Sequence, residues 1–256
     1  MELPVNHFKR ALREGRAQIG LWSHLCSPIS AEILGQCGFD WMVLDMEHSP
    51  NELEQVLHQL QALQGSPTMP VVRPPWNDMV MFKRLLDIGA QTLIVPYIQN
   101  SEEARQAVAY TRYPPHGVRG YAGAPRASGY GRIKDYAKRS ADEICLLLQI
   151  ETREGLEHLE EIARVEGVDG VFIGPGDLSA DMGHLGNPKH PEVVAAVEDA
   201  FKRIRACGKA PGILIGDETL AQHFVAVGGL FVAVGADQNL LRDSASALAS
   251  RFKSRL

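Results

Sequence analysis

The chain has 256 residues, of which 45% are hydrophobic and 22% are charged, so it is long enough to build one well-cored domain. Its net charge of −5 provides no positive field for a polyanion, which argues against nucleic acid as a partner. No apolar stretch reaches the length of a membrane span, and the first residues lack the apolar core of a secretion signal. The four cysteines lie far apart without metal-finger spacing, so we expect free thiols in a reducing cytoplasm and no membrane partner.

A short apolar run followed by an amphipathic helix recurs along the chain. Residues 5–14 predict an extra first helix, and a Gly-rich connection over 117–132 precedes a short helix and the fifth strand. In chain order, the predicted strands are 18–23, 41–46, 70–73, 92–98, 144–150, 168–173, 210–215 and 230–235. The predicted helices that follow them are 28–37, 51–64, 78–88, 101–112, 153–165, 191–206, 217–227 and 238–253.

Eight strand–helix units in one chain predict an α/β fold, a closed (β/α)8 TIM barrel that forms a single domain over residues 1–256. The strands are nearly continuous apolar runs, which is typical of a parallel sheet buried on both faces. We expect the helix over 5–14 to close the bottom of the barrel. An open, doubly wound sheet is the structural alternative, but no G-x-G-x-x-G follows the first strand, so its nucleotide-binding version has little support.

Polar residues stand at the carboxyl ends of several predicted strands. In barrels of this kind, the loops at those ends converge on one pocket that carries the catalytic groups. The run WMVLDMEHSP is the clearest case, because it places three ionisable residues directly after a buried strand. The candidates are Trp22, His24, Asp45, Glu47, His48, Arg73, Gln149, Glu151, Gly176, Asp177 and Asp237.

Two carboxylates in this set indicate a metal site. Gln149 and Glu151 are two residues apart and share one face of their strand, while Asp177 follows the neighbouring strand. Two converging carboxylates with no opposing lysine repel each other unless a cation lies between them. Oxygen ligands favour a hard divalent ion, Mg²⁺ or Mn²⁺ rather than Zn²⁺.

Each candidate also has a plainer interpretation. Asp177 and Glu151 can cap helices. Arg73 can be a structural ion-pair partner, and His48 can be a polar residue at the start of a loop. Asp45 and Glu47 can form a solvated strand end. Taken together, these separate explanations are less convincing than a common site, because all of these residues fall on strand ends that are expected to surround the same pocket, at the mouth of the barrel.

Two other chemistries find no support in the sequence. A Schiff-base aldolase needs a lysine that points into the barrel from a strand. Lysines fall instead on helix patterns, at Lys83, Lys134, Lys138, Lys202 and Lys253, and Lys209 precedes a strand at the wrong end. The nucleophile elbow G-x-S-x-G of serine hydrolases is missing as well.

Several long motifs resemble those of the class II pyruvate-dependent aldolases. They are DMEH after the second strand, VVRPPWND after the third, QIETREG after the fifth and GVDGVFIGPGDLSADMG around the sixth. The likeness covers nearly the whole chain, including RYPPHGVRG, HPEV and GKAPGILI.

This resemblance implies a metal-dependent barrel that assembles as a homohexamer and exchanges its final helix, 238–256, between neighbouring subunits. The cofactor would be Mg²⁺ or Mn²⁺, with Co²⁺ as a further candidate. Glu151 and Asp177 would be the metal ligands, Arg73 would face the enolate oxygen, and His48 would be the acid/base, oriented by Asp45. Gln149, Gly176, Asp177, Trp22 and Leu214 would bind the substrate, and Glu47 and Asp87 would support the site from behind.

The resemblance also implies the reaction, which is reversible cleavage of a 4-hydroxy-2-oxo acid to pyruvate and an aldehyde. In the dicarboxylate case the aldehyde is succinic semialdehyde. Alternatives are a family relative that acts on 2-keto-3-deoxy sugar acids, hydroxypyruvate or an acyl-CoA ester, and an oxo-acid-binding sensor without turnover. The segment YAGAPRASGYG departs from the family pattern in length, and its Arg126 can either contact a distal carboxylate or lie on the surface.

Overall fold

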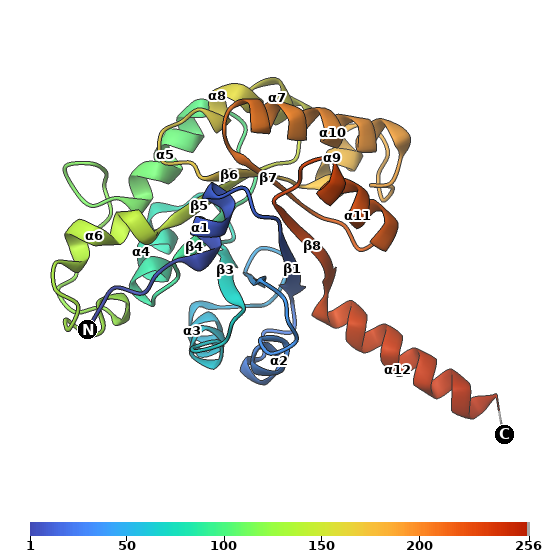
Figure 1. Ribbon diagram of the computed structural model, residues 1–256, viewed down its shortest axis with the longest axis horizontal. Coiled ribbons are helices and arrows are strands. Elements are labelled where there is room, and N and C mark those ends of the chain that lie inside the picture. The colour runs from blue at the N-terminus through green and yellow to red at the C-terminus, as the bar shows by residue number, and fades with distance from the viewer. Residues whose placement is uncertain (255–256) are drawn as a thin grey trace.

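The computed structural model describes residues 1–254, and these form a closed barrel of eight parallel strands that follow chain order around the ring (Figure 1). The predicted (β/α)8 fold is therefore confirmed. The strands are β1 Gln18–Ser23, β2 Trp41–Asp45, β3 Met69–Arg73, β4 Thr92–Val95, β5 Cys145–Ile150, β6 Gly170–Ile173, β7 Ala210–Leu214 and β8 Phe231–Ala236.

Helices follow each strand, and most of them pack around the outside of the barrel (Figure 1). The first two are α1 His7–Arg13, which precedes β1, and α2 Pro28–Leu34. The next are α3 Leu53–Ala62, α4 Met79–Asp87, α5 Ser101–Thr111, the short 3-10 helix η1 Arg126–Ser128 and α6 Tyr136–Glu143. The last are α7 Arg153–Glu157, α8 Leu159–Ala163, α9 Pro175–Asp181, α10 Pro191–Ala206, α11 Glu218–Ala226 and α12 Asp237–Lys253.

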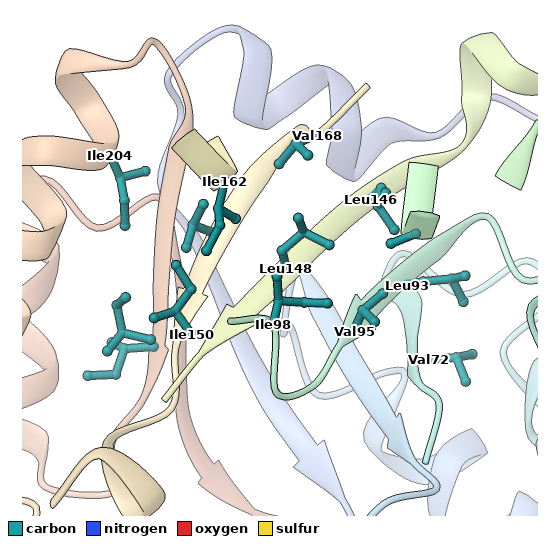
Figure 2. Packing of buried hydrophobic residues seen from close by; sticks show 14 of the residues in the cluster. Val72, Leu93, Val95, Ile98, Leu146, Leu148, Ile150, Ile162, Val168 and Ile204 are labelled. Carbon is teal, nitrogen blue, oxygen red and sulfur yellow. The ribbon is translucent and has the colours of Figure 1, made fainter. Parts of the chain in front are cut away.

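Alternate residues of each strand face the two sides of the barrel wall, because side chains in a strand alternate with a period of two. On β5, Leu146, Leu148 and Ile150 belong to the outer core between strands and helices, which Figure 2 shows together with Ile162 of α8. Leu147 belongs to the core inside the barrel. Gln149, two residues further on, therefore faces inward near the end of its strand.

The barrel interior is filled by aromatic rings. Trp41 and Phe231 pack edge to face with centroids 5.9 Å apart. Two glycines make room for them: a Cβ on Gly20 would lie 2.2 Å from the Trp41 ring, and one on Gly212 would lie 2.2 Å from the Phe231 ring. Phe8 of α1 completes this layer with its centroid 5.6 Å from that of Trp41, so α1 closes the bottom of the barrel as predicted.

Three elements differ from the sequence prediction. The fourth strand ends at Val95 rather than residue 98, because Pro96 has no N–H to donate and Tyr97 has a left-handed backbone with φ of 56°. The predicted helix 153–165 is split into α7 and α8 at His158, whose φ and ψ of −95° and 10° are not helical. Helix α9 was missed, because Pro175 and its neighbouring glycines resemble a loop, although proline is favoured at a first helical position.

Helix α12 extends away from the barrel (Figure 1). Its contacts are mainly with β1 and β8 at its base. Leu241, Leu248 and Phe252 are 59%, 50% and 62% exposed, and their spacing places them on one face. The predicted segment 238–256 includes residues 255–256, which lie outside the described residues. No helix within residues 1–254 combines the length and the apolar character that a membrane span requires.

Candidate active site

A cavity of about 450 Å³ opens at the carboxyl ends of the strands. Eight residues that the sequence predicts for the site line it: Trp22, His48, Arg73, Gln149, Glu151, Gly176, Asp177 and Leu214. His24, which sequence reasoning placed at the end of β1 without a role, lines the cavity too. The further lining residues were not predicted; they are Phe172, Gly174, Pro175, Pro188, Ile215 and Gly216.

Arg73 and Asp45 form a buried, bidentate ion pair beneath the cavity. The two residues are direct neighbours across β2 and β3. Arg73 donates from Nε to Asp45 Oδ1 at 2.7 Å and from Nη2 to Oδ2 at 2.6 Å. Its remaining nitrogen, Nη1, lies 2.9 Å from Glu47 Oε2. Arg73 is thus an ion-pair partner, as its plainer interpretation supposed, and it also lines the cavity with a fixed orientation.

The charge on Asp45 is stabilised by its neighbours. Burial alone would raise the pKa of this carboxyl, but hydrogen bonds from His24 and Arg73 outweigh burial and hold the pKa well below its usual value. The plainer interpretation of Asp45 as a solvated strand end is wrong, because its side chain is 0% exposed.

The structure does not contain the predicted contact between Asp45 and His48. Asp45 Oδ2 instead lies 3.0 Å from Nε2 of His24 and accepts a hydrogen bond from Nε1 of Trp22 at 3.3 Å. The His48 side chain is 61% exposed, and its Nε2 lies 3.9 Å from Glu47 Oε1. The physical reason is register: Trp22 pairs with Val43, so the next inward residues, His24 and Asp45, meet.

Asp237, at the junction of β8 and α12, fixes the backbone that carries His24. Its carboxylate accepts hydrogen bonds from the His24 amide at 2.9 Å, the Leu25 amide at 3.2 Å and the Ser23 hydroxyl at 2.9 Å. Asp237 itself is 3% exposed. The sequence predicted this residue at the mouth, and the structure shows that it holds the end of β1.

Glu151 presents a buried carboxylate to the same cavity. Its Oε1 accepts a hydrogen bond from the Tyr97 amide at 3.0 Å, and Oε2 accepts one from Gln149 Nε2 at 2.6 Å. Burial raises the pKa of Glu151 to about 7; the hydrogen bond from Gln149 opposes this rise, and the charges of Glu47 and Asp177 add to it. Burial is the main cause of the raised pKa, and the neighbouring carboxylates Glu47 and Asp177 add to it because like charges disfavour the ionised form.

The donor set fits a hard divalent cation. Oε1 of Gln149 is buried and has no hydrogen-bond partner among residues 1–254. A Cβ on Gly174 would lie 2.5 Å from Oε2 of Glu151, so glycine keeps space open beside that oxygen. An unpaired amide oxygen and carboxylates whose charges repel are the ligands that Mg²⁺ or Mn²⁺ prefers.

The helix-capping interpretations of the two predicted ligands do not apply. Gly174 is the N-cap of α9, which places Asp177 inside the first turn. Thr152 is the N-cap of α7, where its side chain accepts the amide hydrogen of Gly155, so Glu151 has no capping role either. Neither carboxylate is the N-cap of a helix, and both line the cavity.

The positions of Asp87 and Arg126 in the barrel correct two other expectations drawn from the sequence. Asp87 is the last residue of α4, at the end of the barrel opposite to the mouth, and Nη2 of Arg119 donates to it at 2.8 Å. It therefore does not support the site within one chain. Arg126 donates to the Ile88 carbonyl at 2.6 Å and lines a separate cavity of about 640 Å³, so the loop 117–132 does not border the mouth.

A different group of possible metal ligands lies in the loop before α10. One ligand atom from each of His184, His190 and Glu192 lies within 4.8 Å of the others. Two imidazoles with one carboxylate suit a softer ion than the oxygen ligands at the mouth do. The two sites are therefore chemically distinct.

A closed α/β barrel with a buried arginine, carboxylates and two histidines at its mouth has the architecture of a barrel enzyme. Residues 18–244 match the family described as HpcH/HpaI aldolase/citrate lyase. The chain is 60% identical over 248 residues to the 4-hydroxy-2-oxo-heptane-1,7-dioate aldolase of Klebsiella pneumoniae, which covers 96% of this chain and 94% of that protein. The Escherichia coli aldolase of the same name is 58% identical over 96% of this chain and 95% of its own length.

A solved structure agrees with this match. The crystal structure of an HpcH/HpaI aldolase/citrate lyase family protein from Burkholderia cenocepacia J2315 has a TM-score of 0.92 and 38% identity, over 96% of this chain and 99% of that one. The chain therefore belongs to the HpcH/HpaI aldolase/citrate lyase family. The resemblance drawn from the motifs and the expectation of a carbon–carbon lyase are both confirmed, and a divalent metal cofactor fits this family.

Proposed function

We propose that the chain is a divalent-metal-dependent aldolase that cleaves 4-hydroxy-2-oxo acids reversibly to pyruvate and an aldehyde. Its substrate would be 4-hydroxy-2-oxoheptanedioate, which gives succinic semialdehyde. The observation that carries the proposal is that Arg73, oriented by Asp45, lines the same cavity as Glu151 and Asp177. The substrate assignment is supported by the names of relatives at 58–60% identity.

The cofactor would be Mg²⁺ or Mn²⁺, with Co²⁺ as a further candidate. Glu151 and Asp177 would hold it, with the unpaired Oε1 of Gln149 close by. When bound, the ion supplies Lewis-acid polarisation of the 2-oxo acid.

The chain's own residues would bind and orient the oxo-acid end of the substrate. The amides of Gly176 and Asp177, in the first turn of α9, find no acceptor among the described residues and are available to the substrate carboxylate. Trp22 and Leu214 would pack against its carbon chain, since both line the cavity. Arg73 would face the C2 oxygen and stabilise the negative charge that develops there when the C3–C4 bond breaks.

His48 would move the proton. Its exposed imidazole lines the cavity and is free to approach the 4-hydroxyl group, remove its proton and later return a proton to C3 of the enolate. Glu47, 3.9 Å from His48 and 2.9 Å from Arg73, would support the charge of both. Asp45 would act on this chemistry by holding Arg73 and His24 rather than by contacting His48.

The test is pyruvate release, followed by a coupled NADH assay, from 4-hydroxy-2-oxoheptanedioate and from a shorter monocarboxylate analogue. The enzyme is first stripped with a chelator and then given Mg²⁺ or Mn²⁺. We expect metal-dependent release, faster from the dicarboxylate. Release that is equally fast without metal, or absent from both substrates, contradicts the proposal.

We further propose that residues 1–256 act as one aldolase domain in a cytoplasmic homohexamer whose subunits exchange α12. The exposed face of α12, formed by Leu241, Leu248 and Phe252, supports an exchanged helix, because a helix with an uncovered apolar face gains stability by packing on a neighbour. The four free cysteines support a reducing compartment.

A further inference from the structure

The loop between α9 and α10 brings together three side chains that the proposed aldolase chemistry does not use. Nε2 of His184 lies 2.8 Å from Oε2 of Glu192. The His184 ring stacks on that of His190 with centroids 3.5 Å apart and planes 15° from parallel. One ligand atom from each of the three residues lies within 4.8 Å of the others.

The backbone of this loop is held in place without any ligand. The His184 amide donates to the Ser179 carbonyl at 2.7 Å, the Asn187 amide to the His184 carbonyl at 2.9 Å, and the His190 amide to the Asn187 carbonyl at 3.0 Å. His190 is the N-cap of α10, and Glu192 lies in the first turn of that 16-residue helix. All three Cα positions are thus fixed by secondary structure or by hydrogen bonds.

Only side-chain rotation separates this arrangement from a coordination sphere. Zinc binds imidazole nitrogen at about 2.0–2.1 Å and carboxylate oxygen at about 2.0–2.2 Å, which places tetrahedral ligand atoms about 3.3 Å apart. The observed limit of 4.8 Å means that the atoms must approach by no more than about 1.5 Å. The rings must also open from their stack, so that the ion lies in the plane of each.

We propose that His184, His190 and Glu192 form a binding site for a divalent ion of the zinc class, with water as the fourth ligand. Two imidazoles select Zn²⁺, Ni²⁺ or Cu²⁺ over Mg²⁺ and Ca²⁺, which take oxygen ligands. The ion would take the place of the hydrogen bond between His184 and Glu192. The proposal needs no assumption about the substrate at the mouth.

A bound ion would also act on one wall of the active-site cavity. Pro188 lies between the two histidines in the chain and lines that cavity. Lys189 next to it is paired with Asp217 at 2.6 Å, which ties the same segment to the N-cap of α11. An ion held by His184 and His190 would cross-link the loop on both sides of Pro188 and so stiffen this wall.

The experiment measures the number of zinc ions bound per untagged chain of 256 residues. After equilibrium dialysis against buffered Zn²⁺, bound zinc is measured by elemental analysis, and thermal unfolding is recorded with and without zinc. His184→Gln and His190→Asn each remove one imidazole, and asparagine keeps the N-cap acceptor of α10. We expect each variant to bind one zinc fewer per chain and to lose the zinc-induced rise in melting temperature.

The matched control is His223→Gln. His223 also pairs with a glutamate, Glu198, at 2.6 Å, but with no second histidine in the pair. This variant should keep the full zinc count. Loss of a direct ligand should weaken zinc binding by at least about 100-fold. Loss of a residue that only hydrogen-bonds to a ligand weakens metal binding by about 100-fold at most. Equal zinc counts and affinities in the wild type and His184→Gln, or equal losses in His223→Gln, would overturn the proposal.

Discussion

Nε2 of His24 lies 3.0 Å from Oδ2 of Asp45, the same oxygen that accepts from Nη2 of Arg73 at 2.6 Å. One buried carboxylate oxygen therefore joins the ends of β1, β2 and β3. The histidine that holds Asp45 directly follows the first strand and does not come from the loop that carries His48.

Replacing His24 should loosen Arg73 indirectly. His24→Phe removes the donor to Asp45 Oδ2, and a hydrogen bond to a charged group is worth about 1.5–3 kcal/mol, which corresponds to roughly 10- to 100-fold in rate. We expect this loss in kcat for the aldolase reaction with little change in KM. His24→Gln, which can still donate, should recover part of the rate. Equal rates in the Phe and Gln variants would show that the hydrogen bond has no such role.

Arg73→Lys should separate charge from geometry. Lysine keeps the positive charge but cannot bind Asp45 with two parallel hydrogen bonds, so the charge is no longer fixed toward the substrate oxygen. We expect kcat to fall by about 100- to 1,000-fold, as when a donor to a developing oxyanion is removed. Steady-state kinetics and circular dichroism together check this, since a folded variant with wild-type kcat would contradict the role of Arg73.

His48→Ala should reduce turnover without unfolding the chain. The side chain is 61% exposed, so its removal should change the free energy of unfolding by no more than about 0.5 kcal/mol. Loss of a general base should lower kcat by about 100- to 10,000-fold. Exchange of the C3 protons of pyruvate in deuterated water, followed by NMR, is the direct measurement. Undiminished exchange would assign the proton transfer to another group.

Metal binding should depend on pH through Glu151. Because the pKa of Glu151 is raised to about 7, its carboxyl keeps a proton below that pH and must release it before it can bind a cation. The affinity for Mn²⁺ should therefore rise with pH up to about 7 and level off above it. Calorimetry in two buffers of different ionisation enthalpy measures how many protons are released when Mn²⁺ binds.

The same calorimetry tests the ligand itself. Glu151→Gln should lose Mn²⁺ binding at the mouth, whereas His184→Gln, which alters the separate loop cluster, should bind Mn²⁺ as the wild type does. An Mn²⁺ affinity in Glu151→Gln equal to that of the wild type would remove Glu151 from the ligand set.

Helix α12 should control assembly. Leu241→Asp places a charge on the apolar face that also carries Leu248 and Phe252, and it should shift the oligomer toward smaller species in light-scattering measurements. Ser246→Asp adds the same charge on the other side of the helix and should leave the mass unchanged. A wild-type mass for both variants would mean that this face of α12 is not buried between subunits.

The eight strands were predictable because each is a continuous apolar run buried on both faces of the barrel wall. The positions of Gln149 and Glu151 followed from the same alternation. The pairing of His24 with Asp45 depends on the register of β1 against β2, which one sequence does not specify. Helix α9 was not among the predicted helices, because the glycines on either side of Pro175 are typical of a loop. The sequence left the contact of Arg126 open, and this residue lies away from the mouth because the loop 117–132 connects a helix to the next strand.

The aromatic side chains that fill the barrel interior determine which residues around the cavity can change to accept other substrates. Trp22 and Phe172 line the cavity and lie 5.4 Å apart between ring centroids, and beneath them Trp41 packs against a glycine that admits no larger residue. This rigid floor leaves almost no freedom to enlarge the cavity from below. New aldehyde partners must be accommodated at the rim, around Leu214 and Pro188 and not at the proposed catalytic residue His48. Libraries that diversify this rim alone should alter the accepted aldehyde while retaining the fold.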